Sequence, residues 1–572
     1  MSLVSTGRLR GLQTGTLFSL RGVSSKAGSI AATSASPAGS RAKILVLGTG
    51  WGGFRFSREV DKKKYDVTVV SPRNHFLFTP LLPSTTVGTL EFRCIQEPVR
   101  TIKGLKYLQA HSTGIDFKSK TIRCREVFKG TEHDLDYDYL VIATGAQNNT
   151  FGIPGVSEEN HVFFLKQLGD ARNIRNRLLE CFERAASPFV SEEERSRLLS
   201  FVVVGGGPTS IEYAAELHDF LTTDVKRWYP DLQHKVSVHL VEASDHIMGS
   251  FDEKLISYTT RLLENRKVCP RLLPPPALPL SLFHAFRKKL LLLALDHTGT
   301  FTQPDWRKTQ SSDLACCLCE WCRGPLKRPW RSSRTCCTLS PDPTLRPFAK
   351  HRRVVDSFTP TPQNKMLSCQ TITHRQVKVL LNTSVKSVGP TDCTLGDGRK
   401  LPFGLMVWST GLAPIELVSS MEAVEKDRGR IKIDGRLRVP GLEGVFAMGD
   451  AAVDPANPLG PLAQVADQQG KYLAKSFSKG TIQDDADTPP FNYRHLGSMA
   501  QVGDWKAIAD FKGIGGGDGG GKAASGPVLE GLLAFATWRS AYWTKTVSIA
   551  NKALIPMHWF KAWAFGRDIS RF

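Results

Sequence analysis

The same order of a short apolar run, a glycine-rich turn and an amphipathic stretch occurs twice in this 572-residue chain. In the first copy, AKILVLGTGWGGFRFSREV, residues 44–47 lead directly into Gly48-x-Gly50-x-x-Gly53. An apolar run of this length is typical of a buried parallel strand, and the glycines let a pyrophosphate approach the N-terminus of the next helix. The order predicts a Rossmann-like unit, although another α/β fold with a glycine-rich turn remains an alternative.

The second copy lies about 150 residues further on, in LLSFVVVGGGPTSIEYAAELHDF. Residues 201–204 form the expected strand, and Gly205-x-Gly207-x-x-Ser210 forms the turn. Serine can replace the third glycine of the motif because it is small enough for the helix to pack on the strand. The next strand ends at Glu242, a carboxylate placed to accept hydrogen bonds from a ribose 2′-OH and to repel a 2′-phosphate. This second site should therefore prefer NADH to NADPH, unless Glu242 is an ordinary strand-end carboxylate.

Three further strands end in turns that suit a nucleotide fold. The turns are Thr144-Gly145, Thr410-Gly411 and Gly449-Asp450. At the last of them a carboxylate can bind a sugar or ribityl hydroxyl while the following amides face phosphate. The first unit lacks the ribose acid, since its second strand ends at Ser71. Together these parts predict an α/β protein with two Rossmann-like dinucleotide-binding domains.

The segments SPRNHFLFTPLLPSTTVGTLEFRCIQEPVR, VVVGGGPTSIEYAAELHDF and PLAQVADQQGKYLAKSF make the chain similar to a known family. They resemble the type II, or alternative, NADH:quinone oxidoreductases, which are flavoproteins with two glutathione-reductase-like dinucleotide-binding domains. Members also lack the ribose acid at the position of Ser71. The resemblance covers about residues 43 to 268 and 376 to 572, and it implies non-covalent FAD, NADH and a membrane quinone as cofactor and substrates.

The resemblance also implies roles for individual residues. FAD would be bound through Gly48, Gly50, Gly53, Thr144, Gly145 and the Gly449-Asp450 turn, and NADH through Gly205, Gly207 and Glu242. Gln464 and Gln468 belong to the AQxAxQ segment of the quinone pocket, and Glu212 matches a glutamate proposed to transfer protons. From spacing alone, the two glutamines would instead be exposed polar positions on a surface helix.

The implied reaction is hydride transfer from NADH to FAD and then two-electron transfer to ubiquinone in the respiratory chain, without proton pumping. Two alternatives stay open: a flavoprotein of the apoptosis-inducing-factor type that mainly binds partners, and a relative of the sulfide:quinone oxidoreductases. The second needs two cysteines near the flavin. Outside the segment 269–375 only four cysteines remain, without a recognisable pairing: Cys94, Cys124, Cys181 and Cys393.

The predicted domain boundaries follow from these motifs. Residues 43–160 and 400–478 form the FAD-binding domain, and residues 161–268 and 376–399 form the NADH-binding domain. Residues 1–42 carry five basic and no acidic side chains and nine serines, which is typical of a mitochondrial transit peptide, with a disordered tail as the alternative. No run of eighteen apolar residues occurs, so membrane contact is expected to be peripheral, at the inner membrane.

Residues 479–572 are predicted to be the membrane-anchoring region. From residue 529 onward, tryptophans and aliphatic residues at three- and four-residue spacing alternate with Arg and Lys, as in an amphipathic helix of a membrane interface. Packing on the protein's own core or on a dimer partner is the alternative. The resemblance alone implies a homodimer.

Residues 269–375 interrupt the second nucleotide domain with a proline- and cysteine-rich insert. Three interpretations compete. The first is a zinc site with Cys316 or Cys317, Cys319, Cys322 and Cys336 or Cys337 as ligands, and the second is a disordered insertion. The third is a translated intron, since Val268 and Gln376 have codons that can match intron ends. We favour the intron and expect no metal. From residue 268 to 376 there are 17 Lys and Arg against 6 Asp and Glu, over half of the net charge of +21. No nucleic-acid partner is therefore needed.

Overall fold

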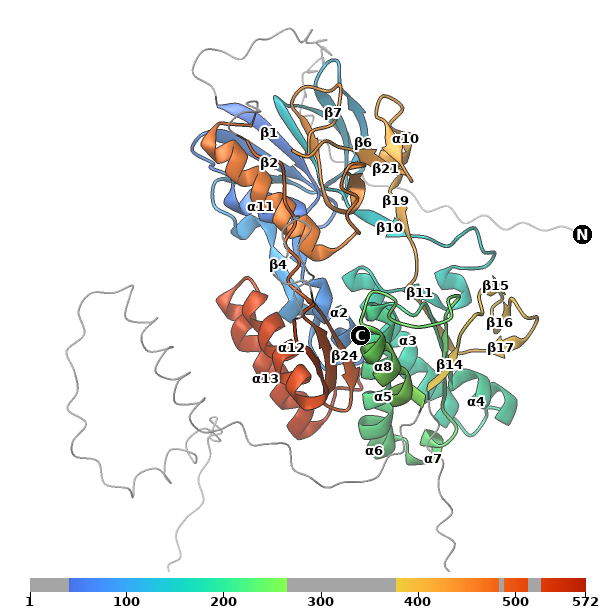
Figure 1. Ribbon diagram of the computed structural model, residues 1–572. Helices are drawn as coiled ribbons and strands as arrows, with labels where there is room; N and C mark the ends of the chain where they lie inside the picture. Colours follow the sequence, from blue (N-terminus) through green and yellow to red (C-terminus); the bar gives the residue numbers. More distant parts are fainter. Residues whose placement is uncertain (1–40, 265–376, 483–487, 513–525, 572) are drawn as a thin grey trace, which may run out of the picture. The chain divides into compact units, whose positions relative to one another are not determined.

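The computed structural model describes residues 41–264, 377–482, 488–512 and 526–571. All of them belong to one compact unit of the chain. The predicted transit peptide up to residue 40 and the predicted insert 269–375 lie outside the described residues. The two nucleotide domains and the C-terminal region can therefore be described directly, and Figure 1 shows their elements.

The first domain is built on a five-stranded parallel sheet in the order β22-β9-β1-β2-β5. Its strands are β1 (Ala42–Leu47), β2 (Tyr65–Val70), β5 (Leu105–Leu108), β9 (Tyr139–Ile142) and β22 (Val445–Ala447). The central parts of β1, β2 and β9 are mostly apolar because both faces of a parallel sheet are covered there. The predicted strand at residues 44–47 is thus confirmed as the central strand β1.

Two helices of the first domain, α1 (Trp51–Glu59) and α11 (Ala463–Lys479), pack against each other although they lie about four hundred residues apart. Their contact depends on glycine. A Cβ on Gly470 would lie 2.5 Å from the carbonyl oxygen of Gly52, and a Cβ on Gly52 would lie 2.8 Å from the sulfur of Met448. The close approach brings the start of α11 next to the first glycine turn.

The second domain repeats this plan in the parallel order β11-β18-β12-β13-β14. The strands are β11 (Val162–Phe164), β12 (Ser200–Val204), β13 (Ser237–Val241), β14 (Val377–Leu380) and β18 (Leu405–Trp408), and the main helices are α3 (Leu168–Ala186), α5 (Pro208–Phe220) and α8 (Glu253–Glu264). The predicted boundary at residue 400 is wrong. Because β18 pairs with both β11 and β12, the second domain continues at least to Trp408.

Two short strands link the domains, where the chain crosses from one sheet to the other. They are β10 (Ala146–Asn148) and β19 (Leu412–Pro414), which pair antiparallel. Two small antiparallel sheets lie outside the parallel ones: β6 (Ala110–Asp116), β7 (Thr121–Glu126) and β8 (Glu132–Asp136), and β15 (Val385–Val388), β16 (Asp392–Leu395) and β17 (Lys400–Pro402). The first Thr-Gly turn therefore leads directly into a link between the domains.

The C-terminal region is a three-stranded antiparallel sheet followed by two helices. Its elements are β24 (Ser498–Gly503), β25 (Lys506–Asp510), β26 (Val528–Glu530), α12 (Gly531–Lys545) and α13 (Ile549–Phe565). Helix α12 packs on β25, and α5 of the second domain packs on β24. Phe535 and Trp538 of α12 lie in one hydrophobic core with the second domain. The predicted alternative of packing on the protein's own core thus holds for this face of α12.

Candidate functional site

The three glycines of the first turn have different surroundings. Gly48 has φ +105° and a Cβ there would clash with the carbonyl oxygen of Ala143, while a Cβ on Gly53 would clash with the carbonyl oxygen of Gly48. Gly50, the N-cap of α1, has no heavy atom within 4 Å of a built Cβ. The turn is therefore tight where the chain packs on itself and open at the helix N-terminus, where an anionic group is favoured.

The second turn has the same geometry. Gly205 has φ +110° and a Cβ there would lie 2.9 Å from the Cβ of Thr410, whereas Gly207, the N-cap of α5, again faces open space. Ser210 is fully buried, and its hydroxyl donates a hydrogen bond to the carbonyl oxygen of Ser409 at 3.4 Å. The serine therefore replaces the third glycine without opening the contact between helix and strand.

Both open glycines line one cavity of about 1530 Å³. Its walls include Gly48 to Gly52 of the first turn, Gly207 to Thr209 of the second turn and Ser409 to Leu412 of the link between the domains. Thr144 and Gly145 also line it, and the Thr144 hydroxyl is a buried polar atom without a hydrogen-bond partner among the described residues. A buried unpaired hydroxyl facing a cavity calls for a polar ligand.

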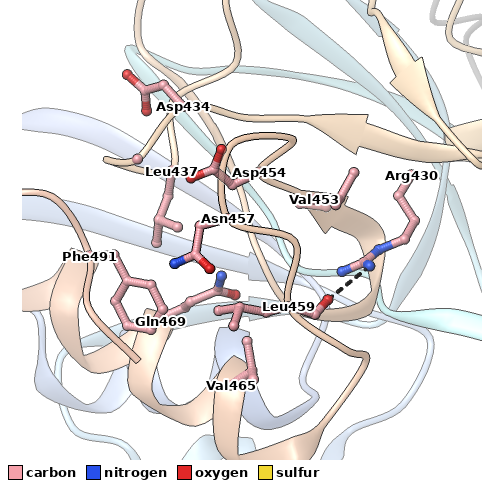
Figure 2. A pocket seen from close by; sticks show the side chains of 12 residues that line it. Arg430, Asp434, Leu437, Val453, Asp454, Asn457, Leu459, Val465, Gln469 and Phe491 are labelled. Carbon is pink, nitrogen blue, oxygen red and sulfur yellow. Dashed lines mark hydrogen bonds between the residues drawn. The ribbon is translucent and has the colours of Figure 1, made fainter. Parts of the chain in front are cut away.

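The Gly449-Asp450 turn closes the cavity from the side of α11. The Gly449 N–H donates to Oε1 of Gln469 at 2.8 Å, which fixes the turn on the helix. Figure 2 shows Gln469 beside a second, small cavity behind this turn, in which the guanidinium of Arg430 donates to the carbonyl oxygen of Leu459 at 3.1 Å. This cavity has a volume of about 20 Å³, enough for about one water molecule, so the ligand site is the large cavity.

Five basic side chains that the motifs did not single out line the large cavity. They are Arg73, His75, His111, Arg125 and Lys166. Burial lowers the pKa of Arg73 to about 10 and that of His75 to about 4, and burial also lowers the pKa of Lys166. The positive charge of the half-buried Arg73 next to an open helix N-terminus suits a phosphate-bearing ligand, whereas His75, with its pKa of about 4, is neutral at neutral pH. Arg73 could have been noticed in the sequence, because it follows Ser71 at the end of the second strand.

The predicted NADH residue Glu242 lies against the second turn and is not among the residues that line the large cavity. Its carboxylate accepts hydrogen bonds from the Gly206 N–H and from the N–H and hydroxyl of Ser244. Carboxylate oxygens have about four acceptor sites, so such contacts leave capacity for a ribose hydroxyl. The structure brings Glu242 to the second glycine turn, as the order of motifs predicts.

Glu212 lies on α5 and is 8% exposed. Its Oε1 accepts the backbone N–H of Gln501 at 3.3 Å and the indole N–H of Trp538 at 3.2 Å. Burial raises the pKa of Glu212 to about 8, and the two hydrogen bonds oppose this shift. A carboxyl group that titrates near neutral pH can donate and accept a proton. The sequence did not reveal its partners, because both belong to the C-terminal region.

Gln464 and Gln468 both bind the backbone of residues 494–497. Gln464 donates to the carbonyl oxygen of Gly497 at 2.8 Å and accepts the Leu496 N–H at 3.2 Å. Gln468 donates to the carbonyl oxygen of Arg494 at 2.8 Å and accepts the Arg494 N–H at 3.0 Å. Neither glutamine lines the large cavity. In the structure the two amides therefore attach the C-terminal region to α11, which the spacing of the motif did not predict.

The cysteines among the described residues offer no redox pair. All four are buried and free, and burial raises the pKa of each thiol to about 11. The described residues also contain no group of His, Cys, Asp or Glu side chains arranged to hold a metal ion. The cysteine cluster in the predicted insert lies outside the described residues.

Helices α12 and α13 expose large apolar side chains on the face away from the core. They are Leu532, Leu533, Ile549, Met557, Phe560, Trp563 and Phe565. Among the described residues, no helix has both the length and the hydropathy needed to span a bilayer. An exposed apolar surface of this kind marks an interaction with a protein or a membrane.

Comparisons with known proteins agree with this architecture. The sequence model described as pyridine nucleotide-disulphide oxidoreductase matches residues 42–272 and 353–470, and the NDH2 C-terminal domain matches residues 495–568. This chain belongs to the type II NADH dehydrogenase (NDH2) family. The family assignment predicted from the sequence is thereby confirmed.

Relatives of this NDH2 protein match over most of their length. A probable NADH dehydrogenase of Dictyostelium discoideum is 34% identical and covers 93% of this chain and 91% of its own. The internal alternative NAD(P)H-ubiquinone oxidoreductase A1, mitochondrial, of Solanum tuberosum is 34% identical, and the match covers 92% of this chain and 88% of the relative. The structure of NDH2 from Plasmodium falciparum in complex with NADH matches with 23% identity and a TM-score of 0.67. The match covers 93% of this chain and 100% of that chain. The predicted α/β fold with two dinucleotide-binding domains is confirmed.

Proposed function

We propose that this NDH2 protein is a mitochondrial NADH:quinone oxidoreductase that contains FAD, oxidises NADH and reduces ubiquinone without pumping protons. The observation that carries the proposal is that both open glycines, Gly50 and Gly207, face the same cavity of about 1530 Å³. Two helix N-termini facing one cavity suit two phosphate-bearing molecules held side by side. The names of the relatives, which include NADH-ubiquinone oxidoreductases, support the substrates.

The residues that line the first part of the cavity fit FAD. Gly50 leaves room for the pyrophosphate, Thr144 offers a hydroxyl without a partner, and Arg73 and Lys166 supply positive charge. Asp450 would bind a ribityl hydroxyl, and Gly48, Gly53, Gly145 and Gly449 would shape the turns around it. When bound, FAD supplies the chemistry that links a two-electron hydride donor to a quinone.

The second turn would hold NADH, with Gly205 and Gly207 near its pyrophosphate and Glu242 at the adenosine ribose. Glu212 would hold the proton that quinone reduction consumes, since its pKa of about 8 allows both protonation states near neutral pH. Gln464 and Gln468 would contribute to the quinone site by holding residues 494–497 in place. The remaining side chains orient the reactants and exclude water.

We also propose peripheral attachment to the inner membrane through the exposed apolar face of α12 and α13, close to a substrate that is dissolved in the bilayer. A homodimer is the expected assembly. Light scattering at defined protein concentrations would show a mass of one or of two chains of 63.1 kDa.

The purified protein with NADH and a short-chain quinone tests the reaction. Rapid steady turnover, dependent on both substrates, is the expected result. Slow reduction of the bound flavin without quinone turnover would instead support a partner-binding flavoprotein of the apoptosis-inducing-factor type.

A further inference from the structure

Two buried carboxyl groups lie one helical turn apart on α5. Glu212 is 8% exposed and Glu216 is 2% exposed, and their spacing of four residues places them on the same face of the helix. Two neighbouring buried carboxylates cannot both remain ionised at low cost, so their partners decide which of them carries a proton.

The partners of the two carboxyl groups are unequal. Glu212 accepts hydrogen bonds from two neutral donors, the backbone N–H of Gln501 and the indole N–H of Trp538. Glu216 accepts the hydroxyls of Ser84 at 2.7 Å and Thr89 at 2.6 Å, and the side-chain amide of Gln501 at 3.3 Å. It also forms an ion pair with Nη2 of Arg567 at 3.5 Å.

Arg567 reaches this site from the tail that follows α13. Its side chain is 11% exposed, its Nη1 lies 2.8 Å from Oδ2 of Asp224, and its Nε donates to the Thr89 hydroxyl at 2.8 Å. The same hydroxyl donates to Glu216, so Thr89 connects the cation to the carboxylate. Gly566 makes this approach possible, because it has φ +85° and a Cβ there would lie 2.9 Å from Asp224.

The tail is held at a second point. The carbonyl oxygen of Asp568 accepts a hydrogen bond from Nη2 of Arg175 at 3.1 Å, and its carboxylate lies 3.6 Å from the same guanidinium. Because Arg175 is 1% exposed, this contact is part of the core rather than a surface ion pair. The position of Arg567 is thus set by the fold on both sides of the residue.

Other charged and titratable groups surround the pair. They are Asp219 on α5, Asp224 on the neighbouring turn of helix, Arg539 and Tyr542 on α12, and Arg567. Arg539 packs its guanidinium over the rings of Trp505, Phe535 and Trp559 at 4.4 to 5.0 Å. Arg567 is therefore the cation whose contact with Glu216 the geometry supports.

We propose that Arg567 is a positioning residue that keeps Glu216 ionised and thereby leaves Glu212 as the carboxyl group that takes up and releases a proton. The effect of Arg567 on quinone turnover rests on the proposed proton role of Glu212. Which of the two carboxyl groups carries the proton does not depend on that role, and it can be measured without turnover. The last residues of the chain would then belong to the proton-handling part of the site.

Infrared spectroscopy of the carboxyl C=O stretch tests the proposal on the full-length, FAD-containing protein between pH 5 and 10. The variant Glu212→Gln/Glu216→Gln provides the baseline for all other carboxyl groups. Relative to it, the unsubstituted protein should show a carboxyl band that disappears with a midpoint near pH 8. Glu212→Gln should show no such band, because Arg567 keeps Glu216 ionised. A band that still titrates in Glu212→Gln would overturn the proposal.

Removing the cation gives the complementary test. Glu212→Gln/Arg567→Gln should regain a titrating band, now from Glu216, and Arg567→Gln alone should move the midpoint upward by about one pH unit, because a nearby cation favours the ionised form. Arg567→Lys should keep the original midpoint. The exposed Arg571→Gln is the matched control from the same tail, and an equal shift in that variant would overturn the proposal.

A variant that avoids an unpaired buried charge covers the case in which Arg567→Gln does not fold. Asp224→Asn/Glu216→Gln/Arg567→Gln removes both buried anions that contact the guanidinium together with the cation. Glu212 should then titrate at lower pH, because it has lost a negative neighbour. An unchanged midpoint would overturn the coupling, whereas loss of quinone turnover with the expected midpoints would contradict only the proposed role of Glu212.

Discussion

The Glu212 carboxylate accepts a hydrogen bond from the indole of Trp538 at 3.2 Å, although 326 residues separate them in the chain. One belongs to the helix that follows the second glycine turn, and the other belongs to the first C-terminal helix. The contact joins the nucleotide domain to the region with the exposed apolar face. It makes the C-terminal region part of the site, so a deletion of residues 529–572 would disturb more than membrane attachment.

Replacing Trp538 with phenylalanine keeps most of the packing and removes the N–H donor. Because this hydrogen bond favours the ionised carboxylate, its loss should raise the pKa of Glu212 further. The free energy of unfolding should fall by about 1 to 3 kcal/mol, as expected for a buried group that loses its partner. Chemical denaturation measures this, with the exposed Trp563→Phe as control. Equal stability of the two variants would contradict the assignment.

Glu212→Gln should change how stability depends on pH. The folded protein binds a proton at Glu212 up to about pH 8, whereas the unfolded chain releases it near pH 4.5. Between these values the folded state holds more protons, so the unsubstituted protein should lose stability as pH rises. The variant lacks this contribution. The difference in thermal midpoint, variant minus unsubstituted protein, should therefore be more positive at pH 8.5 than at pH 5.5. Parallel curves would show that Glu212 does not titrate in this range.

Substitutions at two glycines of the first turn should affect FAD binding and folding stability separately. Gly50→Ala adds a methyl group where the protein has no atom within 4 Å, so the fold should persist while FAD content falls by about tenfold or more. Gly53→Ala places a methyl group against the carbonyl oxygen of Gly48 and should lower stability by about 1 to 3 kcal/mol. Flavin absorbance per protein and unfolding of both variants distinguish the two effects. Normal FAD content in Gly50→Ala would argue against the proposed pyrophosphate site.

The glutamines of α11 should act on the quinone site through the backbone. Gln464→Leu removes two hydrogen bonds to residues 496 and 497, so the Leu496 amide should exchange with solvent faster by about tenfold. The KM for quinone should rise while the KM for NADH stays unchanged. Lys475→Leu, at an exposed position of the same helix, serves as control. A normal quinone KM together with fast exchange at Leu496 would exclude a role in the quinone site.

The apolar face of α13 should determine membrane binding. Phe560→Ser and Trp563→Ser replace exposed side chains that are not part of the buried core, so folding should be retained. Each loss should weaken binding to vesicles by about tenfold, as burial of one such side chain contributes about 1.5 to 3 kcal/mol. The control is Phe189→Ser, an exposed phenylalanine outside the C-terminal region. Vesicle flotation measures the bound fraction, and unchanged flotation of both variants would place the contact elsewhere.

The sequence by itself determined the two nucleotide domains. The glycine turns follow directly from local chemistry. A strand that ends just before Gly48 or Gly205, followed by a helix that begins after Gly50 or Gly207, requires a tight turn that glycine permits. The central parallel strands can also be predicted from the sequence, because both of their faces are buried and most of their residues are apolar. These signals are contained in about twenty consecutive residues each.

Only the tertiary structure decided the contacts between distant segments. The sequence order could not assign β18 to the second sheet, because strand pairing depends on register with β11 and β12. It also could not reveal that the amides of Gln464 and Gln468 bind residues 494–497. The partners of Glu212 lie in the C-terminal region for the same reason: burial and hydrogen bonding are properties of packed neighbours, which the chain brings together only when it folds.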